Sequence, residues 1–210
     1  MSKVNYQKIL DQIIEKHEKE GNRPLLLLHA CCAPCSSYVL EYLHRYFRIL
    51  LCYYNPNIYP EAEYRKRVEE LKRFVKEAGY EEDILLLEGP YDPERFFAMA
   101  KGMEDLPERG ERCRACYRLR MEEAAAQAAR HHADYFTTTL SISPHKNADW
   151  INEIGEELAA GYGVAHLPSD FKKKSGYLRS IELSKKYGLY RQDYCGCIFS
   201  RREAERLRSS

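Results

Sequence analysis

The sequence of 210 residues lacks both kinds of segment that would direct it into or across a membrane. No stretch approaches the ~20 consecutive apolar residues that a membrane-spanning helix needs. Residues 1–20 are charged and amphipathic, and they lack the apolar core of a signal peptide. We therefore expect a cytoplasmic protein, and in that compartment clustered cysteines more often bind metal or change redox state than form structural disulfides.

The chain also lacks a large net charge and the common phosphate-binding motifs. Its formal net charge is +1, with 33 Lys and Arg residues against 32 Asp and Glu residues. Bulk charge therefore indicates no polyanionic partner, and any nucleic-acid site must come from local clustering. There is neither a glycine-rich dinucleotide fingerprint nor a Walker loop. We see no repeat or linker, so we expect one domain over residues 1–210.

Short apolar runs alternate with helical patterns along the whole chain. Strands are expected at residues 25–30, 48–54, 84–87, 135–140 and 163–167. Helices are expected at residues 4–20, 36–47, 61–78, 114–131, 148–160 and 176–187, and from residues 92 and 198. This alternation indicates an α/β fold with a mainly parallel, doubly wound sheet. Such sheets bind ligands at the carboxyl ends of their strands, where the strand order reverses.

Seven of the eight cysteines form three tight clusters. The clusters are Cys31-Cys32-Ala-Pro-Cys35, Cys113-Arg-Ala-Cys116 and Cys195-Gly-Cys197. The first cluster directly follows the first expected strand and precedes a helix, whose dipole and free amides favour thiolates. The remaining residue, Cys52, lies within an expected strand and is interpreted as a core residue.

The spacing within the clusters leaves several kinds of chemistry open. Cys113 and Cys116 can fill two positions on zinc or on an iron–sulfur cluster, or form a dithiol. Together with Cys31 and Cys32 they complete a four-thiolate set. The one-residue gap of Cys195-Gly-Cys197 would strain an internal disulfide, which suits a redox dithiol or ligands to a second metal. A structural zinc half-site is the alternative.

Basic residues flank the second and third clusters and could form a phosphate-binding surface. They are Arg112, Arg114, Arg118, Arg120, Lys172, Lys173, Lys174, Arg179, Arg201 and Arg202. For each run taken singly, a solvated helix face with paired charges is the usual interpretation. Some tyrosines could stack on an unpaired base or simply pack in the core. They are Tyr53, Tyr54, Tyr59, Tyr177, Tyr190 and Tyr194.

Two polar loops are expected at the same edge of the sheet as Cys31. One is Asn55-Pro-Asn57-Ile-Tyr-Pro60, after the second strand, and the other runs from Thr137 to Lys146. The hydroxyl groups of the second loop, with His145 and Lys146 at a helix start, suit the binding of an anion or polar substrate. Ordinary helix capping explains its serines equally well.

The combined motifs resemble the QueH family of epoxyqueuosine reductases that do not use cobalamin. The resemblance rests on His29-Ala-Cys-Cys-Ala-Pro-Cys35, Tyr54-Asn-Pro-Asn-Ile58, Cys113-x-x-Cys-Tyr-x-x-Arg120, Thr137-Thr-Thr-Leu140, Ser143-Pro-His-Lys146 and Tyr190-Arg-Gln-x-Tyr-Cys-Gly-Cys197. The resemblance covers about residues 24–202 and implies a fold like that of adenine-nucleotide alpha-hydrolases, so the single domain expected over residues 1–210 would be catalytic. It also implies a [4Fe–4S] cluster and the reduction of epoxyqueuosine in the tRNA wobble position to queuosine.

We hypothesise a division of labour among the cysteines on this basis. Cys31, Cys32, Cys113 and Cys116 are predicted to bind the cluster. Cys195 and Cys197 are predicted to be catalytic together with Cys35. They would act as a redox dithiol, or they would bind a second metal ion, iron, with a carboxylate such as Asp170 or Asp193.

The expected partners are tRNA carrying epoxyqueuosine and an electron donor that the sequence does not identify. Two other functions remain open. One is an iron–sulfur tRNA sulfurtransferase on a related fold, which the missing phosphate loop argues against. The other is a zinc-stabilised RNA-binding module without catalysis.

Overall fold

The computed structural model describes residues 4–209, and its centre is one sheet of five parallel strands in the order β3-β2-β1-β4-β5. The strands are β1 (Leu25–His29), β2 (Arg48–Tyr53), β3 (Ile84–Glu88), β4 (Tyr135–Thr138) and β5 (Ala165–His166). This is the order of the first five strands of the dinucleotide-binding fold. The prediction of a Rossmann-like, doubly wound parallel sheet is therefore confirmed.

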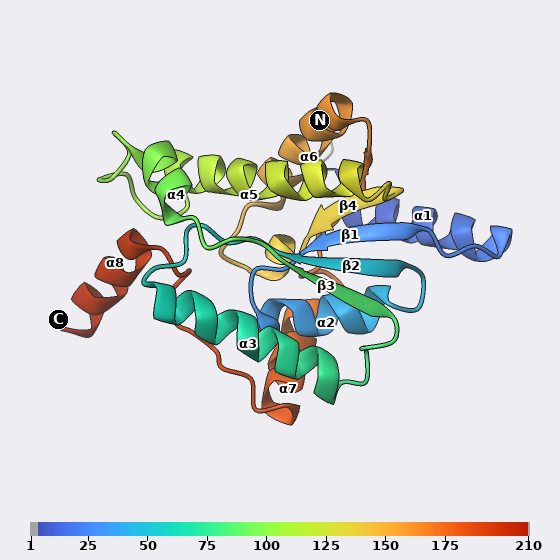
Figure 1. Cartoon of the computed structure of the whole chain (residues 1–210), viewed down its shortest axis with the longest axis horizontal. Coiled ribbons are helices and arrows are strands. Elements are labelled where there is room, and N and C mark those ends of the chain that lie inside the picture. The colour runs from blue at the N-terminus through green and yellow to red at the C-terminus, as the bar shows by residue number, and fades with distance from the viewer. Residues whose placement is uncertain (1–3, 210) are drawn as a thin grey trace.

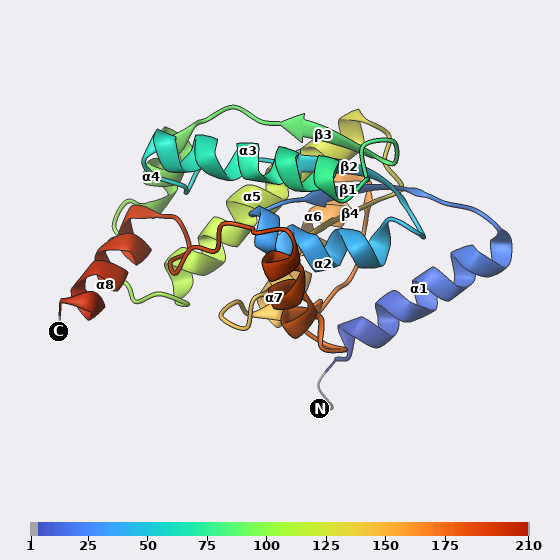
Figure 2. The same ribbon diagram turned by 90° about the horizontal axis from the view of Figure 1, so that it is seen from below.

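Helices cover both faces of the sheet. They are α1 (Tyr6–Glu20), α2 (Ala33–Leu43), α3 (Glu61–Glu77), α4 (Pro93–Ala100), α5 (Glu111–Arg130), α6 (Ala148–Tyr162), α7 (Gly176–Lys186) and α8 (Ile198–Arg208). Helices α2, α3 and α7 lie on one face, and α5 and α6 lie on the other (Figures 1 and 2). Helix α8 lies beyond the end of α3, away from the middle of the sheet (Figure 2).

The apolar run of β1 explains why this strand lies at the centre. Leu26 and Leu28 pack into the core formed with α1, α2 and α3, whereas Leu27 packs against α5 and α6. All three side chains are fully buried. A strand that is buried on both faces has no polar side, so its sequence is continuously apolar instead of alternating.

Several element boundaries differ from the prediction. Helix α2 begins at Ala33 with Cys32 as its N-cap, not at Ser36 or Ser37. The hydroxyls of Ser36 and Ser37 instead donate to carbonyl groups of Cys32 and Pro34, each at 2.8 Å. A proline fits the first turn of a helix because its missing N–H has no intrahelical partner there. The helix therefore starts within the first cysteine cluster.

Two further boundaries differ from the prediction, one at the second cysteine cluster and one at the polar loop after β4. Helix α5 begins at Glu111, three residues before the predicted start, so both cysteines of the second cluster are helical. Strand β4 ends at Thr138, and Thr139–Ile142 forms a 3-10 turn instead of continuing the strand. The Thr138 side chain accepts a hydrogen bond from the Leu140 backbone N–H, which stabilises that turn.

The strand order reverses between β1 and β4. His29, at the end of β1, links the two strands because its Nδ1 lies 2.8 Å from the Thr138 hydroxyl oxygen. Its Nε2 donates to the carbonyl oxygen of Tyr54 at 3.0 Å. Burial lowers the pKa of His29 to about 3, so the imidazole is neutral at physiological pH. The switch point of the sheet is thus fixed by a buried, neutral histidine.

Among residues 4–209, no helix combines the length and the apolar character that crossing a membrane requires.

Candidate metal and active site

All seven clustered cysteines line one cavity at the carboxyl edge of the sheet. The cavity has a volume of about 430 Å³ and lies beside the switch point. The eight cysteines of the chain are free thiols. Three clusters that are almost 80 residues apart in sequence therefore converge on one space. The first of them lies at the carboxyl end of β1, as its position in the sequence predicts.

The first cluster has the geometry of a metal site. The Sγ atoms of Cys31, Cys32 and Cys35 all lie within 4.8 Å of one another. Thr139 orients Cys31, because its hydroxyl donates to the Cys31 sulfur at 3.3 Å and accepts the Cys31 backbone N–H at 3.1 Å. Three convergent thiols suit a soft metal or an iron–sulfur cluster.

The same three thiols share negative charge. Hydrogen bonds from Cys32 and Cys35, aided by the nearby cations of Lys146 and Arg120, hold the pKa of Cys31 well below its usual range. The interaction with Cys31 in turn raises the pKa of Cys32 to about 11. The arrangement thus favours one thiolate, centred on Cys31, that its neighbours stabilise.

The second cluster lies in the first turns of α5. Cys113, Cys116 and Arg120 are spaced at i, i+3 and i+7, so their side chains share one face of the helix. Burial raises the pKa of Cys113 to about 11 and that of Cys116 to about 12. A bound metal cation reverses this preference, because a coordinated thiol is deprotonated.

The third cluster lies in the turn that leads into α8. Cys197 is the N-cap of α8, and its sulfur accepts the backbone N–H of Ser200 at 3.4 Å. Gly196 has a φ of 121°, which only glycine adopts readily. Cys195 and Cys197 are close enough to Cys113 and Cys116 to interact with them electrostatically. The second and third clusters therefore face the same part of the cavity.

Cationic side chains outnumber acidic ones around the cavity. The cations are Arg67, Arg109, Arg112, Arg120, Lys146 and Arg191, against Glu108 and Asp193. Burial alone would lower the pKa of Lys146, but the charges of Cys195, Cys31 and Cys35 outweigh it and raise that pKa. The seven thiols can ligate a metal, and the six positive groups beside them can balance the negative charge of a metal–thiolate centre.

Comparisons with known proteins show which family this chain belongs to. The sequence model of the family described as "Epoxyqueuosine reductase QueH" matches residues 26–203. The chain belongs to this family. A protein named Epoxyqueuosine reductase QueH from Staphylococcus epidermidis is 45% identical over 202 residues, which cover 94% of this chain and 85% of the relative. A protein of the same name from Streptococcus pyogenes is 42% identical over 200 residues, which cover 94% of this chain and 78% of that relative.

Among solved structures, an NMN synthetase from Francisella tularensis aligns with a TM-score of 0.49 and 13% sequence identity. The alignment covers 91% of this chain and 74% of that one. The similarity contributes nothing to the assignment of a function.

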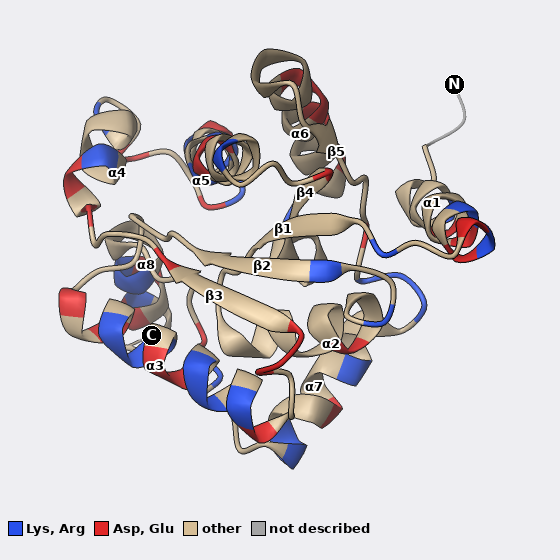
Figure 3. Cartoon of the chain, turned by 45° about the vertical axis from the view of Figure 1, so that its right-hand side comes forward, with Lys and Arg blue, Asp and Glu red and all other residues tan. Residues whose placement is uncertain are grey.

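In this QueH family member, the basic residues predicted to surround the cysteines mostly do not. Only Arg112 and Arg120 of that set line the cavity. Arg114 and Arg118 pair with glutamates of α6, and Lys174 pairs with Asp11. Figure 3 shows Lys and Arg interspersed with Asp and Glu over the helices, which is typical of a solvated, paired surface.

The predicted aromatic residues divide between core and cavity. Tyr53 and Tyr54 are fully buried, so they cannot stack on a substrate. Tyr177 and Tyr194 line the cavity. Tyr190 lies in a neighbouring groove under the Lys66 ammonium group, 3.4 Å from its Nζ to the ring centre.

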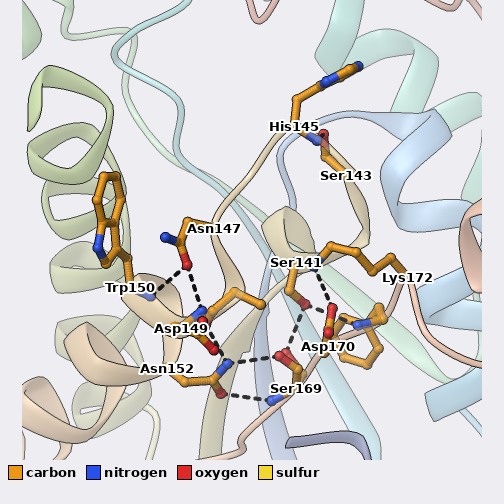
Figure 4. A network of polar contacts seen from close by, with 12 residues as sticks. Ser141, Ser143, His145, Asn147, Asp149, Trp150, Asn152, Ser169, Asp170 and Lys172 are labelled. Atoms are coloured by element: carbon orange, nitrogen blue, oxygen red, sulfur yellow. Dashed lines mark hydrogen bonds and ion pairs between the residues drawn. The ribbon is translucent and has the colours of Figure 1, made fainter. Parts of the chain in front are cut away.

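The polar loop after β4 has two roles. Ser143, His145 and Lys146 line the cavity. Ser141 instead joins a buried network, in which its hydroxyl lies 3.0 Å from that of Ser169. Figure 4 shows this network beneath the loop, with Ser143 and His145 extending away from it. The network anchors the base of the loop, so that its outer part can present polar groups to the cavity.

The two candidate carboxylates are separated by the fold. Asp193 lines the cavity. Asp170 does not, and its carboxylate pairs with Lys172 at 2.5 Å, as Figure 4 also shows. Asp193 also has a cationic partner, since its carboxylate pairs with Arg208, and of the two carboxylates only Asp193 lies at the cavity.

Three cationic residues of the cavity were not among the basic residues predicted to surround the cysteines. Arg109 lies on the rim, where its Nη2 contacts His145 Nδ1 at 2.8 Å and its backbone N–H donates to the Cys113 sulfur. Arg191 and Arg67 approach from the C-terminal segment and from α3. Arg109 carries no sequence signal beyond its closeness to Cys113, whereas Arg191 belongs to the motif Tyr190-Arg-Gln-x-Tyr-Cys-Gly-Cys197. Arg67 does carry one, since it lies among the apolar positions Tyr64, Val68 and Leu71 on one face of α3.

Proposed function

We propose that this protein reduces epoxyqueuosine to queuosine in tRNA, as one catalytic domain over residues 1–210. The observation that carries the proposal is the convergence of seven thiols and six cations on one cavity at the switch point of the sheet. Membership of the QueH family supplies the substrate. The clustered free thiols favour a reducing compartment, so we place the enzyme in the cytoplasm.

The cofactor we propose is a [4Fe–4S] cluster with a second redox or Lewis-acid element beside it. An iron–sulfur cluster supplies electrons one at a time, and a second iron would polarise the epoxide oxygen. Cys31, Cys32, Cys113 and Cys116 would hold the cluster. Cys195 and Cys197, with Cys35 or Asp193, would hold the second metal or act as a dithiol.

The closeness of Cys35 to Cys31 and Cys32 supports a second partition of the same thiols. In that partition the first cluster of cysteines holds one metal centre together. The four thiols of the second and third clusters hold the other. Iron counted per protein and the [4Fe–4S] signal in Cys35→Ala and Cys195→Ala separate the two partitions. In the first partition both variants keep the [4Fe–4S] signal, because neither residue is a ligand of that cluster. In the second partition one of the two variants loses it.

The protein's own residues would bind the substrate and balance charge. The reaction takes up two electrons and two protons, and the epoxide oxygen leaves as water. The cations that line the cavity stabilise thiolates and attract the phosphates of RNA to its mouth. Tyr177 and Tyr194 offer aromatic rings to an unpaired base. An electron donor must supply the reducing equivalents.

The two alternatives are less well supported. A tRNA sulfurtransferase needs ATP activation, and the loop after β1 carries cysteines where a phosphate loop would lie. A zinc-stabilised RNA-binding module does not account for the family match over residues 26–203.

Anaerobic incubation with epoxyqueuosine-containing tRNA and a chemical reductant tests the function. Nucleoside mass analysis should show a product that has lost one oxygen atom. A sulfur-containing product would support the sulfurtransferase. Unchanged tRNA with a colourless, zinc-loaded protein would support the binding module.

A further inference from the structure

Arg67 is the most completely buried charge that approaches the cavity from α3. Its side chain is 2% exposed and pairs with Glu63, which is 12% exposed, through Nε at 2.8 Å. Its Nη1 donates to the backbone carbonyl of Cys195 at 3.0 Å. Its Nη2 is buried and has no hydrogen-bond partner within the described residues. A guanidinium left with an unpaired donor in a buried site is costly unless a ligand satisfies it.

The turn that carries Cys195 and Cys197 is shaped around this side chain. A Cβ atom on Gly196 would lie 2.9 Å from Arg67 Nη1 and 3.1 Å from Ile58 Cγ1. The carbonyl of Gly196 accepts the backbone N–H of Tyr59 at 3.0 Å. Glycine is therefore required twice over, by its positive φ and by the close approach of the guanidinium.

The unpaired nitrogen belongs to a residue that lies between two cysteine groups. Arg67 lines the cavity, binds the Cys195 carbonyl and is close enough to Cys32 to interact with it electrostatically. Its guanidinium also lies over the ring of Tyr194, 5.4 Å from the ring centre. One planar side chain thus contacts the third cluster while facing the first.

We infer that Arg67 holds the Cys195–Cys197 turn against the first cysteine cluster and donates its free Nη2 hydrogen bond to an anionic acceptor bound in the cavity. The acceptor is sulfur of the metal centre or an oxygen of the substrate. Arg67 is therefore a positioning residue that also recognises a ligand. The role of Arg67 in holding the turn follows from geometry alone. A hydrogen bond from Arg67 to a substrate oxygen would rest on the proposed function.

Helix α3 supplies a matched control two turns away. Arg73 donates through Nη1 to the carbonyl of Tyr187 at 3.1 Å and through Nη2 to that of Gly188 at 3.3 Å. It thus holds the same C-terminal segment by the same kind of contact, but it does not line the cavity. Arg67→Lys and Arg73→Lys each keep the charge and lose the planar fork.

The first measurement uses metal-free protein and needs no substrate. Mass spectrometry follows the alkylation rate of each cysteine in Arg67→Lys, Arg73→Lys and the wild type. Arg67→Lys should raise the rates of Cys195 and Cys197 about tenfold and leave Cys52 unchanged, since the turn loses its anchor. Arg73→Lys should leave all these rates unchanged. Equal rates in Arg67→Lys and the wild type would overturn the positioning role.

A second variant keeps the test valid if Arg67→Lys folds poorly. Gly196→Ala should raise the same two alkylation rates while Arg67 is intact, because its Cβ displaces the turn from the guanidinium. Rates equal to those of the wild type in Gly196→Ala would also contradict the inference.

The second measurement distinguishes the sources of the acceptor in iron-loaded protein. If the acceptor is sulfur of the metal centre, Arg67→Lys changes the visible and paramagnetic-resonance spectra without substrate. If it is a substrate oxygen, the spectra stay the same and KM for epoxyqueuosine-tRNA rises about tenfold with little change in kcat. Unchanged spectra together with an unchanged KM would overturn the ligand-binding role.

Discussion

The two edges of the sheet each carry a hollow of nearly the same size, but only one has the chemistry of a site. The cavity at the carboxyl edge measures about 430 Å³, and a hollow at the amino edge measures about 400 Å³. At the amino edge, Arg23 donates to the carbonyls of His44 and Phe47, and Asp134 accepts the backbone N–H of Leu25. These polar groups join chain segments together and are satisfied by them.

At the carboxyl edge, by contrast, several buried polar atoms lack a hydrogen-bond partner among the described residues. Asn57 Oδ1, Arg67 Nη2 and Arg120 Nε are buried without hydrogen-bond partners, and all three residues line the cavity. Within residues 4–209, no residue of the amino-edge hollow has such an atom. Volume therefore does not distinguish a binding site from a surface hollow, whereas thiols and unpaired buried polar atoms do.

The largest expected effect comes from a thiol of the cavity. Cys116→Ala should lose bound iron and reduce turnover about 100-fold or more, because it removes a proposed metal ligand from a buried position. Iron per protein and single-turnover yield measure the two effects. Cys52→Ala is the control, since Cys52 is buried but does not line the cavity. Its iron content and turnover should match those of the wild type, with a stability loss of about 1 kcal/mol.

Removal of a buried cation at the same edge should weaken metal binding without abolishing it. Arg120 is 2% exposed and shares a face of α5 with Cys113 and Cys116. Arg120→Met keeps the side-chain bulk and removes the charge that balances thiolates. The rate of iron loss to a chelator should rise about tenfold. Iron loss at the wild-type rate would contradict the role of the cavity cations.

The matching substitution at the amino edge should affect stability alone. Arg23→Met removes hydrogen bonds to the carbonyls of His44 and Phe47, so urea unfolding should show a loss of about 1 kcal/mol. Iron content and turnover should be unchanged. A loss of iron in this variant would break the comparison between the two edges.

The smallest effect concerns the segment that closes the cavity near α3. Burial alone would raise the pKa of Glu70, but hydrogen bonds from Arg73 and the Tyr190 backbone N–H lower it below the ordinary value of 4.5. Its stabilisation is thus present above pH 4.5 and is lost as pH falls through the lower folded-state pKa. Glu70→Gln should cost about 0.5 kcal/mol at pH 7, because solvent screens these partly exposed contacts, and urea unfolding should show the difference shrinking toward pH 3.

Most of the sheet and one wall of the cavity are predictable from the sequence. The apolar run before Cys31 predicts β1 because a strand buried on both faces has no polar alternation. The rule that ligands bind at carboxyl ends then places Cys31 and the loop after Thr138 together, as the contact of Thr139 with Cys31 confirms. The helix starts were predicted less well, because Cys32 and Gly110 cap α2 and α5 without a side-chain hydrogen bond.

The electrostatic part of the site depends on tertiary packing. Arg114 and Arg120 look alike in the sequence, yet one pairs with Glu153 at the surface and the other is buried beside cysteines. Their positions on the helix distinguish them, because Arg120 lies on the same face of α5 as Cys113 and Cys116 and Arg114 does not. The same argument applied to α3 would have placed Arg67 on its buried face. The partner of Arg67, the Cys195 carbonyl, is 128 residues away and has no local signal.

We propose that the cysteine-lined cavity reduces epoxyqueuosine through metal held by its thiols. The most direct test loads the protein with increasing amounts of iron under anaerobic conditions and measures single-turnover product per protein. We expect the product to rise in proportion to bound iron and to be absent from metal-free protein. Full turnover by metal-free protein, or a yield independent of bound iron, would contradict it.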